Sequence, residues 1–145
     1  MKREETIDYH IKTCWHAIYR MYNQQAVQHE STTSMAFVLL NIDPKEGTPA
    51  TKIAPLMGLE SRSLTRMLKN MEEKGFIYRM QDPDDGRSVR IRLTELGQDK
   101  RNVSREKVIR FNEVVKENLD PEKLKNFVEV VTKINQLIES KSVFE

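Results

Sequence analysis

A segment near the middle of the chain combines short hydroxyl side chains with long cations. These residues are Ser61, Arg62, Ser63, Thr65, Arg66 and Lys69. An arginine can donate two parallel hydrogen bonds to a guanine edge, whereas serine, threonine and lysine can bind phosphate oxygens. The chemistry that this set suits is recognition of a polyanion such as DNA. The alternative is an ordinary solvated helix face, which carries the same residue types.

The apolar residues of this segment predict a helix over residues 61–74. They recur at three- and four-residue steps and therefore form one buried stripe, away from the hydroxyl and basic side chains. Ser61 is the expected N-cap, and Gly75 ends the helix. The stripe consists of Leu64, Met67, Leu68 and Met71.

A shorter helix is expected directly before this one. Thr48 is its predicted N-cap, Pro49 its first helical residue and Gly58 its C-terminal glycine. Pro55 lies inside it and removes one backbone hydrogen bond. Two helices joined by a tight turn form a helix-turn-helix, whose second helix enters the DNA major groove.

A β-hairpin is predicted after the second helix. Residues 76–81 and 89–93 have strand character, and the segment between them is dense in Asp, Pro and Gly. A helix-turn-helix followed directly by such a hairpin is the plan of a winged helix. The alternative is a polar turn on a hairpin with a purely structural role.

Arginines give the predicted wing its DNA-binding chemistry. We expect Arg87 at the tip to enter the minor groove, and Arg90 to be a second wing contact. Arg90, Arg79 and Arg92 either bind phosphates or pair with the aspartates of the tip. The residues expected to support the wing, by holding Arg87 or permitting the turn, are Asp82, Asp85 and Gly86.

Long helices are predicted at both ends of the chain. Residues 5–29 carry an apolar stripe, Ser31 caps a helix that runs to Leu40, Thr94 caps one that runs to about Asn118, and Asp120-Pro121 opens the last. Their excess apolar surface predicts a symmetric dimer. The predicted fold is mainly α with a small β-hairpin wing, a single protomer over 1–145. Residues 31–95 form its winged helix-turn-helix, and 1–30 and 96–145 its helical dimerisation region.

Composition agrees with a DNA-binding protein. The chain has 145 residues, of which 38% are hydrophobic and 32% charged, with a formal net charge of +2. Residues 61–110 hold thirteen Lys and Arg against eight Asp and Glu, which is the expected footprint of phosphate contacts.

No segment approaches the ~20 apolar residues of a membrane span. With no export signal and one cysteine, we expect a cytoplasmic protein that does not bind membranes.

Other kinds of site receive weaker support. Cys14 lies on an apolar stripe beside Trp15, which favours a buried inert thiol over a redox sensor. His10, Cys14, His16 and the distant His29 lack a matching carboxylate cluster, so no metal site is expected. No phosphate-binding loop or activated nucleophile is present, so the sequence predicts neither a catalytic centre nor a cofactor.

Aromatic residues are the candidates for an effector pocket. They sit at helical spacing near the N-terminus, where core or dimer interface is the alternative role. These residues are Trp15, His16, Tyr19, Tyr22 and Phe37.

The whole chain resembles the MarR family of bacterial regulators. The segment Leu59–Ile77 is similar to the family's recognition helix, with its Thr-Arg pair at Thr65-Arg66 and a closing Glu-Lys-Gly-aliphatic signature. Asp85-Gly86-Arg87 and Leu93–Gly97 resemble the Asp-x-Arg and Leu-Thr-Glu-x-Gly elements of the family wing.

This resemblance implies a homodimer whose first and last helices interlock on a pseudo-palindromic double-stranded DNA operator. It implies a repressor, often of its own or a neighbouring operon, that a small aromatic or lipophilic effector releases from DNA. The alternative is a protein-interaction module or antirepressor on the same fold without DNA binding. Exposure of the cations on the second helix would discriminate between the two.

Overall fold

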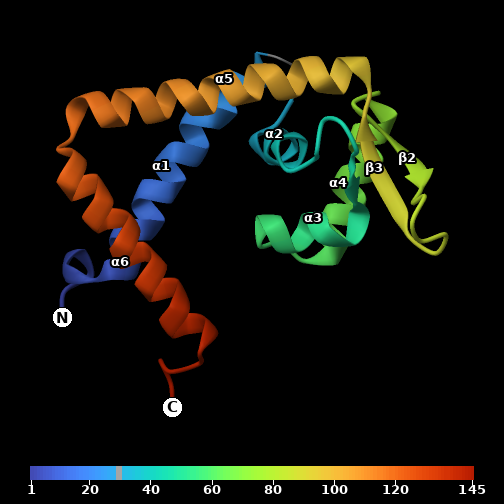
Figure 1. Ribbon diagram of the computed structural model, residues 1–145. Coiled ribbons are helices and arrows are strands. Elements are labelled where there is room, and N and C mark those ends of the chain that lie inside the picture. Colours follow the sequence, from blue (N-terminus) through green and yellow to red (C-terminus); the bar gives the residue numbers. More distant parts are fainter. Residues whose placement is uncertain (29–30) are drawn as a thin grey trace. The chain divides into compact units, whose positions relative to one another are not determined.

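The computed structural model describes residues 1–28 and 31–145, which form two compact units. Residues 1–107 make up the first and residues 108–145 the second. The elements of the first unit are the 3₁₀ helix η1 (Arg3–Glu5), α1 (Ile7–Val27), α2 (Thr33–Leu40), β1 (Thr48–Pro49), α3 (Ala50–Met57), α4 (Ser61–Glu73), β2 (Ile77–Gln81), β3 (Val89–Leu93) and the start of α5 (Glu95–Asn118) (Figure 1). The second holds the end of α5 and α6 (Pro121–Glu139). The fold is mainly helical, as predicted.

The N-caps of α2, α3 and α4 differ from the prediction, and that of α3 is Pro49 rather than Thr48. Thr32 rather than Ser31 caps α2, because its hydroxyl accepts a hydrogen bond from the backbone N–H of Met35 at 3.2 Å. Glu60 rather than Ser61 holds the N-cap position of α4 and makes no side-chain cap bond, so Ser61 is the first helical residue. His29, proposed at the end of the first helix, lies outside the described residues.

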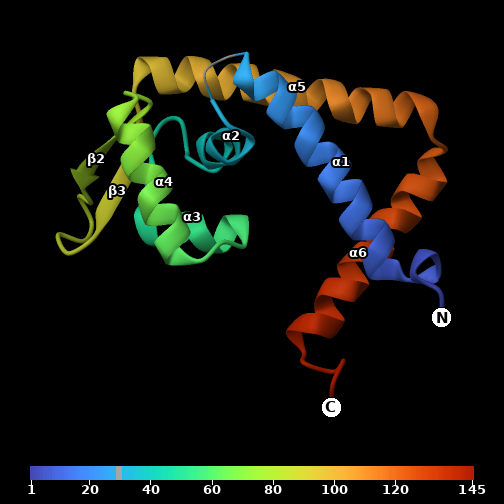
Figure 2. The same ribbon diagram turned by 180° about the vertical axis from the view of Figure 1, so that it is seen from behind.

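The helix-turn-helix is present as predicted, but α3 begins at Ala50 rather than Pro49 and α4 ends at Glu73 rather than Lys74. Gly58 ends α3 in the left-handed conformation, with φ of 65°, which a glycine adopts without strain. Pro55 lies in the last turn of α3 and is exposed. Figures 1 and 2 show α3 and α4 side by side, with the hairpin of β2 and β3 next to α4.

The sheet has three strands, one more than predicted. Thr48 and Pro49 do not start a helix but form β1, in which Thr48 pairs with Ile91 and Pro49 with Arg90. The strand order is β1-β3-β2, and both pairings are antiparallel. The wing is therefore anchored on both sides of β3.

One hydrophobic core connects these elements. It takes side chains from α2, α3, α4 and the sheet, and so holds the two helices of the helix-turn-helix against the wing. Val38, Leu39, Ile53, Met71 and Ile91 have no exposed surface. At the start of α5, the hydroxyl of Thr94 accepts from the N–H of Gly97 at 2.9 Å and donates to the carbonyl of Gly75, which ties α5 to the end of α4.

The second unit leaves much apolar surface uncovered. Asp120 caps α6 by accepting from the N–H of Glu122 at 2.8 Å, and Pro121 occupies the first turn, as predicted. Phe127, Val128 and Ile138 of α6 are about 60% exposed (60%, 61% and 59%). Among the described residues, none of the helices has the length and hydropathy of a membrane-spanning segment.

The close approach of α5 to the backbone of Phe76, the residue before β2, yields a stability prediction. A Cβ on Gly97 would lie 1.8 Å from the carbonyl oxygen of Phe76, a backbone atom that cannot move alone. Gly97→Ala should therefore destabilise the protein by ~1–3 kcal/mol or more. In Gly86→Ala the nearest atom is the flexible amide of Gln81 at 3.0 Å, so this control should melt close to wild type. Thermal melts at equal protein concentration that fail to separate the two variants would contradict this packing.

Candidate nucleic-acid interface

The face of α4 that the core does not cover carries the polar residues singled out in the sequence. Leu64, Leu68 and Met71 are buried, and Met67 is half-buried, so the apolar stripe faces the core. The opposite faces are exposed at Ser61, Arg62, Ser63, Thr65, Arg66 and Lys69. The Thr65 hydroxyl donates to the carbonyl of Ser61 at 2.9 Å but keeps its acceptor capacity.

The cations of this face are available to a ligand. Among residues 1–28 and 31–145, the side chains of Arg62, Arg66 and Lys69 make no hydrogen bond or ion pair. The same holds for the side chain of Arg87 at the wing tip. Unpaired and exposed, these side chains place positive charge on the first two-thirds of α4 and at the wing tip.

Arg79 of β2, unlike these cations, forms an ion pair within the protein. Its Nε lies 2.9 Å from a carboxylate oxygen of Glu72 in the last turn of α4, and both side chains are substantially exposed. An exposed pair of this kind contributes little to stability. It does lower the positive charge at the junction between α4 and the wing.

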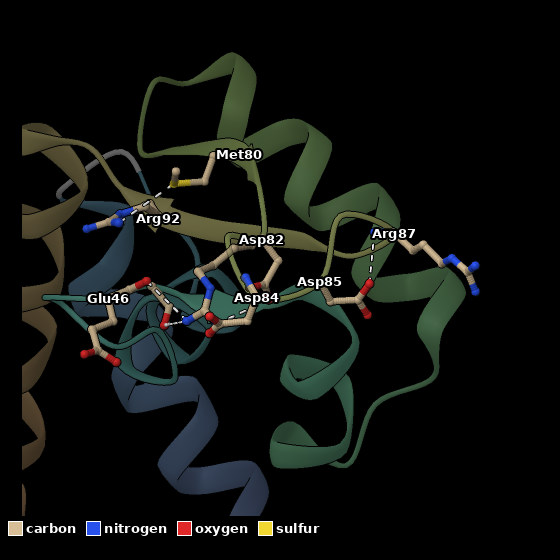
Figure 3. Close-up of polar contacts among 9 residues, drawn as sticks. Glu46, Met80, Asp82, Asp84, Asp85, Arg87 and Arg92 are labelled. Atoms are coloured by element: carbon tan, nitrogen blue, oxygen red, sulfur yellow. Dashed lines mark hydrogen bonds and ion pairs between the residues drawn. The ribbon is translucent and has the colours of Figure 1, made fainter.

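Asp85 and Gly86 shape the wing tip through the backbone. The carboxylate of Asp85 accepts from the backbone N–H of Arg87 at 3.0 Å, and the carbonyl of Gly86 accepts from the Gln81 side chain at 2.9 Å. Figure 3 shows the guanidinium of Arg87 extending away from Asp82 and Asp84. The aspartates thus hold the main chain of the tip and leave the Arg87 side chain unpaired.

Asp82 binds Arg90 rather than Arg87. Its Oδ2 lies 3.2 Å from Nη2 of Arg90, and its Oδ1 accepts from the backbone N–H of Asp84 at 3.0 Å. The pKa of Asp82 is below its ordinary value, mainly because of the hydrogen bond from the N–H of Asp84 and to a lesser extent because of the charge of Arg90. Burial acts in the opposite direction and raises it. Arg92 contacts the carbonyl of Lys45 at 2.5 Å. The pairing of Arg90 with Asp82 is the alternative to phosphate binding that the sequence left open. A carbonyl partner leaves no signal in a sequence, so the contact of Arg92 with Lys45 could not be predicted.

Four of the five predicted pocket residues form a ring cluster on α1 and α2. Phe37 stacks on Trp15 with centroids 6.0 Å apart and meets Tyr22 edge-on at 6.1 Å. The Tyr19 hydroxyl lies 3.1 Å from that of Ser34, whereas His16 is exposed. Burial raises the pKa of Tyr22.

A cavity lies beside Tyr22, the one predicted residue that lines it. Sequence reasoning missed its basic lining residues Lys100 and Lys107, because they come from α5 at positions distant from the aromatic stripe. The remaining lining residues are Gln25, Ala26, Ser31, Ala36, Val103 and Ser104.

The expected burial of Cys14 is wrong. The thiol is exposed, because the described residues of the first unit leave this face of α1 open: Ile7, Ile11 and Trp15 are 64%, 43% and 47% exposed. Within the part of the chain that the structure describes, no three His, Cys, Asp or Glu side chains are grouped so that they could hold a metal ion.

The exposed cationic helix, its preceding helix and the three-stranded wing define a winged helix-turn-helix protein of the DNA-binding class. The model of the MarR family matches residues 32–89, from the N-cap of α2 to the start of β3. The regulator SarZ of Staphylococcus saprophyticus is 32% identical over 116 residues, which span 77% of this chain and 80% of SarZ. The chain belongs to the MarR family and is a transcriptional regulator of that type.

Solved structures have the same fold. The S. aureus MepR–DNA complex superposes with a TM-score of 0.82 at 21% identity, over 90% of this chain and 97% of MepR. The PcaV regulator of Streptomyces coelicolor, solved with its natural ligand, gives a TM-score of 0.79 at 18% identity, over 94% of this chain and 96% of PcaV.

Proposed function

We propose that the protein is a homodimeric repressor of a pseudo-palindromic operator whose half-sites lie about one helical turn apart. The observation that carries this proposal is the exposed, unpaired set of cations on α4. Their exposure favours DNA binding over a protein-interaction module, in which they would be covered by the protein's own helices. MepR, a structural neighbour, was solved bound to DNA. SarZ, one of the sequence relatives, is a transcriptional regulator, and we propose no catalytic activity for this chain.

The two basic regions take different parts of the DNA. Arg62 and Arg66 project from the first half of α4 and are suited to guanine edges in the major groove. Lys69, one turn later, and the hydroxyls of Ser61, Ser63 and Thr65 are suited to phosphates. Arg87, at the tip of the wing, is suited to a narrow minor groove.

Selection of bound fragments from the source genome tests this function. Wild type should enrich a pseudo-palindrome, and the Arg62→Ala/Arg66→Ala/Arg87→Ala triple variant should not, because it lacks the base-reading cations. A matched control changes Lys123, Lys125 and Lys133 of α6 to Ala and should keep the enrichment. Failure of a folded wild-type dimer to enrich any sequence would contradict the proposal.

Repression has a separate readout. A repressor bound at the selected site blocks transcription, so deletion of the gene should raise the transcript beside that site. A fall in that transcript would make the protein an activator.

Dimerisation would cover the apolar faces of α1 and α6. Light scattering at micromolar concentration should give twice the 17.0 kDa mass of the chain. Val128→Glu should weaken the dimer, since it places a charge on a face that we expect to be buried in the dimer, whereas Glu129→Gln beside it should not. A wild-type mass of 17.0 kDa would rule out this architecture.

The cavity beside Tyr22 is the proposed effector site. An aromatic ring next to lysines suits a small lipophilic or aromatic acid, and PcaV was solved with a natural ligand. In a panel of aromatic and fatty acids, we expect an active acid to release DNA and its neutral amide to be weaker. Lys107→Met should reduce the response and the exposed Lys123→Met should not. Equal responses from acid and amide would refute the assigned role of the lysines.

A further inference from the structure

Arg90 of β3 is enclosed by the base of the wing. Its side chain is 17% exposed and that of its partner Asp82 is 7% exposed. The Nε atom of Arg90 is buried. Its Nη1 lies 3.4 Å from the carbonyl oxygen of Glu46 and 3.5 Å from that of Gly47. One guanidinium therefore joins the residue after β2 to the turn between α2 and β1.

That turn is itself firmly shaped. The carboxylate of Asp43 accepts from the backbone N–H groups of Lys45 and Glu46, each at 2.8 Å. These two hydrogen bonds lower the pKa of Asp43, and the bond from Glu46 has the larger effect. Gly47 has a φ of +73°, and a Cβ there would lie 2.5 Å from the carbonyl oxygen of Ile91. The turn thus lies directly against β3 and offers Arg90 a fixed surface.

The pairing of Arg90 makes it a poor phosphate ligand. Turning its guanidinium to DNA would break the contact with Asp82 and leave that carboxylate buried without its counter-charge, which is strongly unfavourable. The guanidinium of Arg87 breaks no such contact when it turns to DNA, because only the backbone N–H of Arg87 is hydrogen-bonded, to Asp85. The two wing arginines therefore differ: Arg90 is paired within the protein, whereas the side chain of Arg87 is unpaired.

We propose that Asp82, Arg90 and the turn Asp43–Gly47 form a clamp that fixes the wing against the winged domain, and that Arg90 acts on DNA only by positioning Arg87. This clamp deepens the proposed function and rests on it. Asp82 and Arg90 are positioning residues here, and Arg87 is the residue that touches DNA.

A comparison of substitutions at Asp82 and Asp84 distinguishes a positioning role from a general effect of charge on DNA binding. Asp82→Asn and Asp84→Asn each remove one negative charge near the DNA, and Asp84 is exposed at the tip. If charge alone mattered, both variants would bind the selected duplex as well as wild type or better. The clamp predicts that Asp82→Asn binds about tenfold more weakly, as after loss of one good contact, and that Asp84→Asn does not. Equal behaviour of the two variants would overturn the proposal.

Substitutions of Arg90 give a second test. A lysine binds a phosphate as a point charge but cannot bond Asp82 and two carbonyls together. Arg90→Lys should therefore lose affinity nearly as Arg90→Gln does. In an Arg87→Ala background, both changes should have little further effect, because the clamp acts through Arg87. Wild-type affinity of Arg90→Lys, or full additivity with Arg87→Ala, would make Arg90 a phosphate contact.

Hydrogen exchange tests the clamp without DNA. Asp82→Asn and Arg90→Gln should speed amide exchange in residues 43–47 and 82–92, while Asp84→Asn should not. Unchanged exchange in the first two variants would overturn the clamp. Failure to find an operator would count against the proposed function alone, since this measurement needs none.

Discussion

Burial of one side of α4 is the interaction on which the winged domain depends. Leu64 and Leu68 are each 3% exposed and Met71 is fully covered, so the helix can rotate only at the cost of its core contacts. Because the stripe faces inward, Arg62 and Arg66 must face outward. The burial that stabilises the domain therefore also exposes the cations of α4 to solvent.

The wing depends on a second constraint, the seating of the turn Asp43–Gly47 against β3. Pairing of Thr48 with Ile91 and the lack of space for a side chain at Gly47 fix this contact. A two-stranded hairpin alone is marginally stable, and anchoring it on both sides of β3 makes it part of the core. The tip can then keep a defined direction while its arginine stays exposed.

Local sequence patterns predicted the helices and the cationic face, which depend on neighbours three or four residues away, and the hairpin, which depends on alternation and turn residues. Contacts between distant segments escaped them. Thr48 looked like a cap but pairs with Ile91, more than forty residues later. For Arg90 the sequence offered a phosphate or an aspartate of the tip as partner, and it gave no sign of the carbonyls of residues 46 and 47. Cys14 looked buried because its stripe is apolar, although the first unit leaves the thiol exposed.

Dimethyl sulfate footprinting on the selected site tests the central claim most directly, since the reagent methylates guanine N7 in the major groove and adenine N3 in the minor groove. If α4 reads bases and the wing reaches outward, guanine protection should fall in two clusters about one helical turn apart. Adenine protection should flank each cluster and disappear in Arg87→Ala. Protection of minor-groove adenines alone, or no protected guanine in either half-site, would contradict the assignment of α4 as the reading helix.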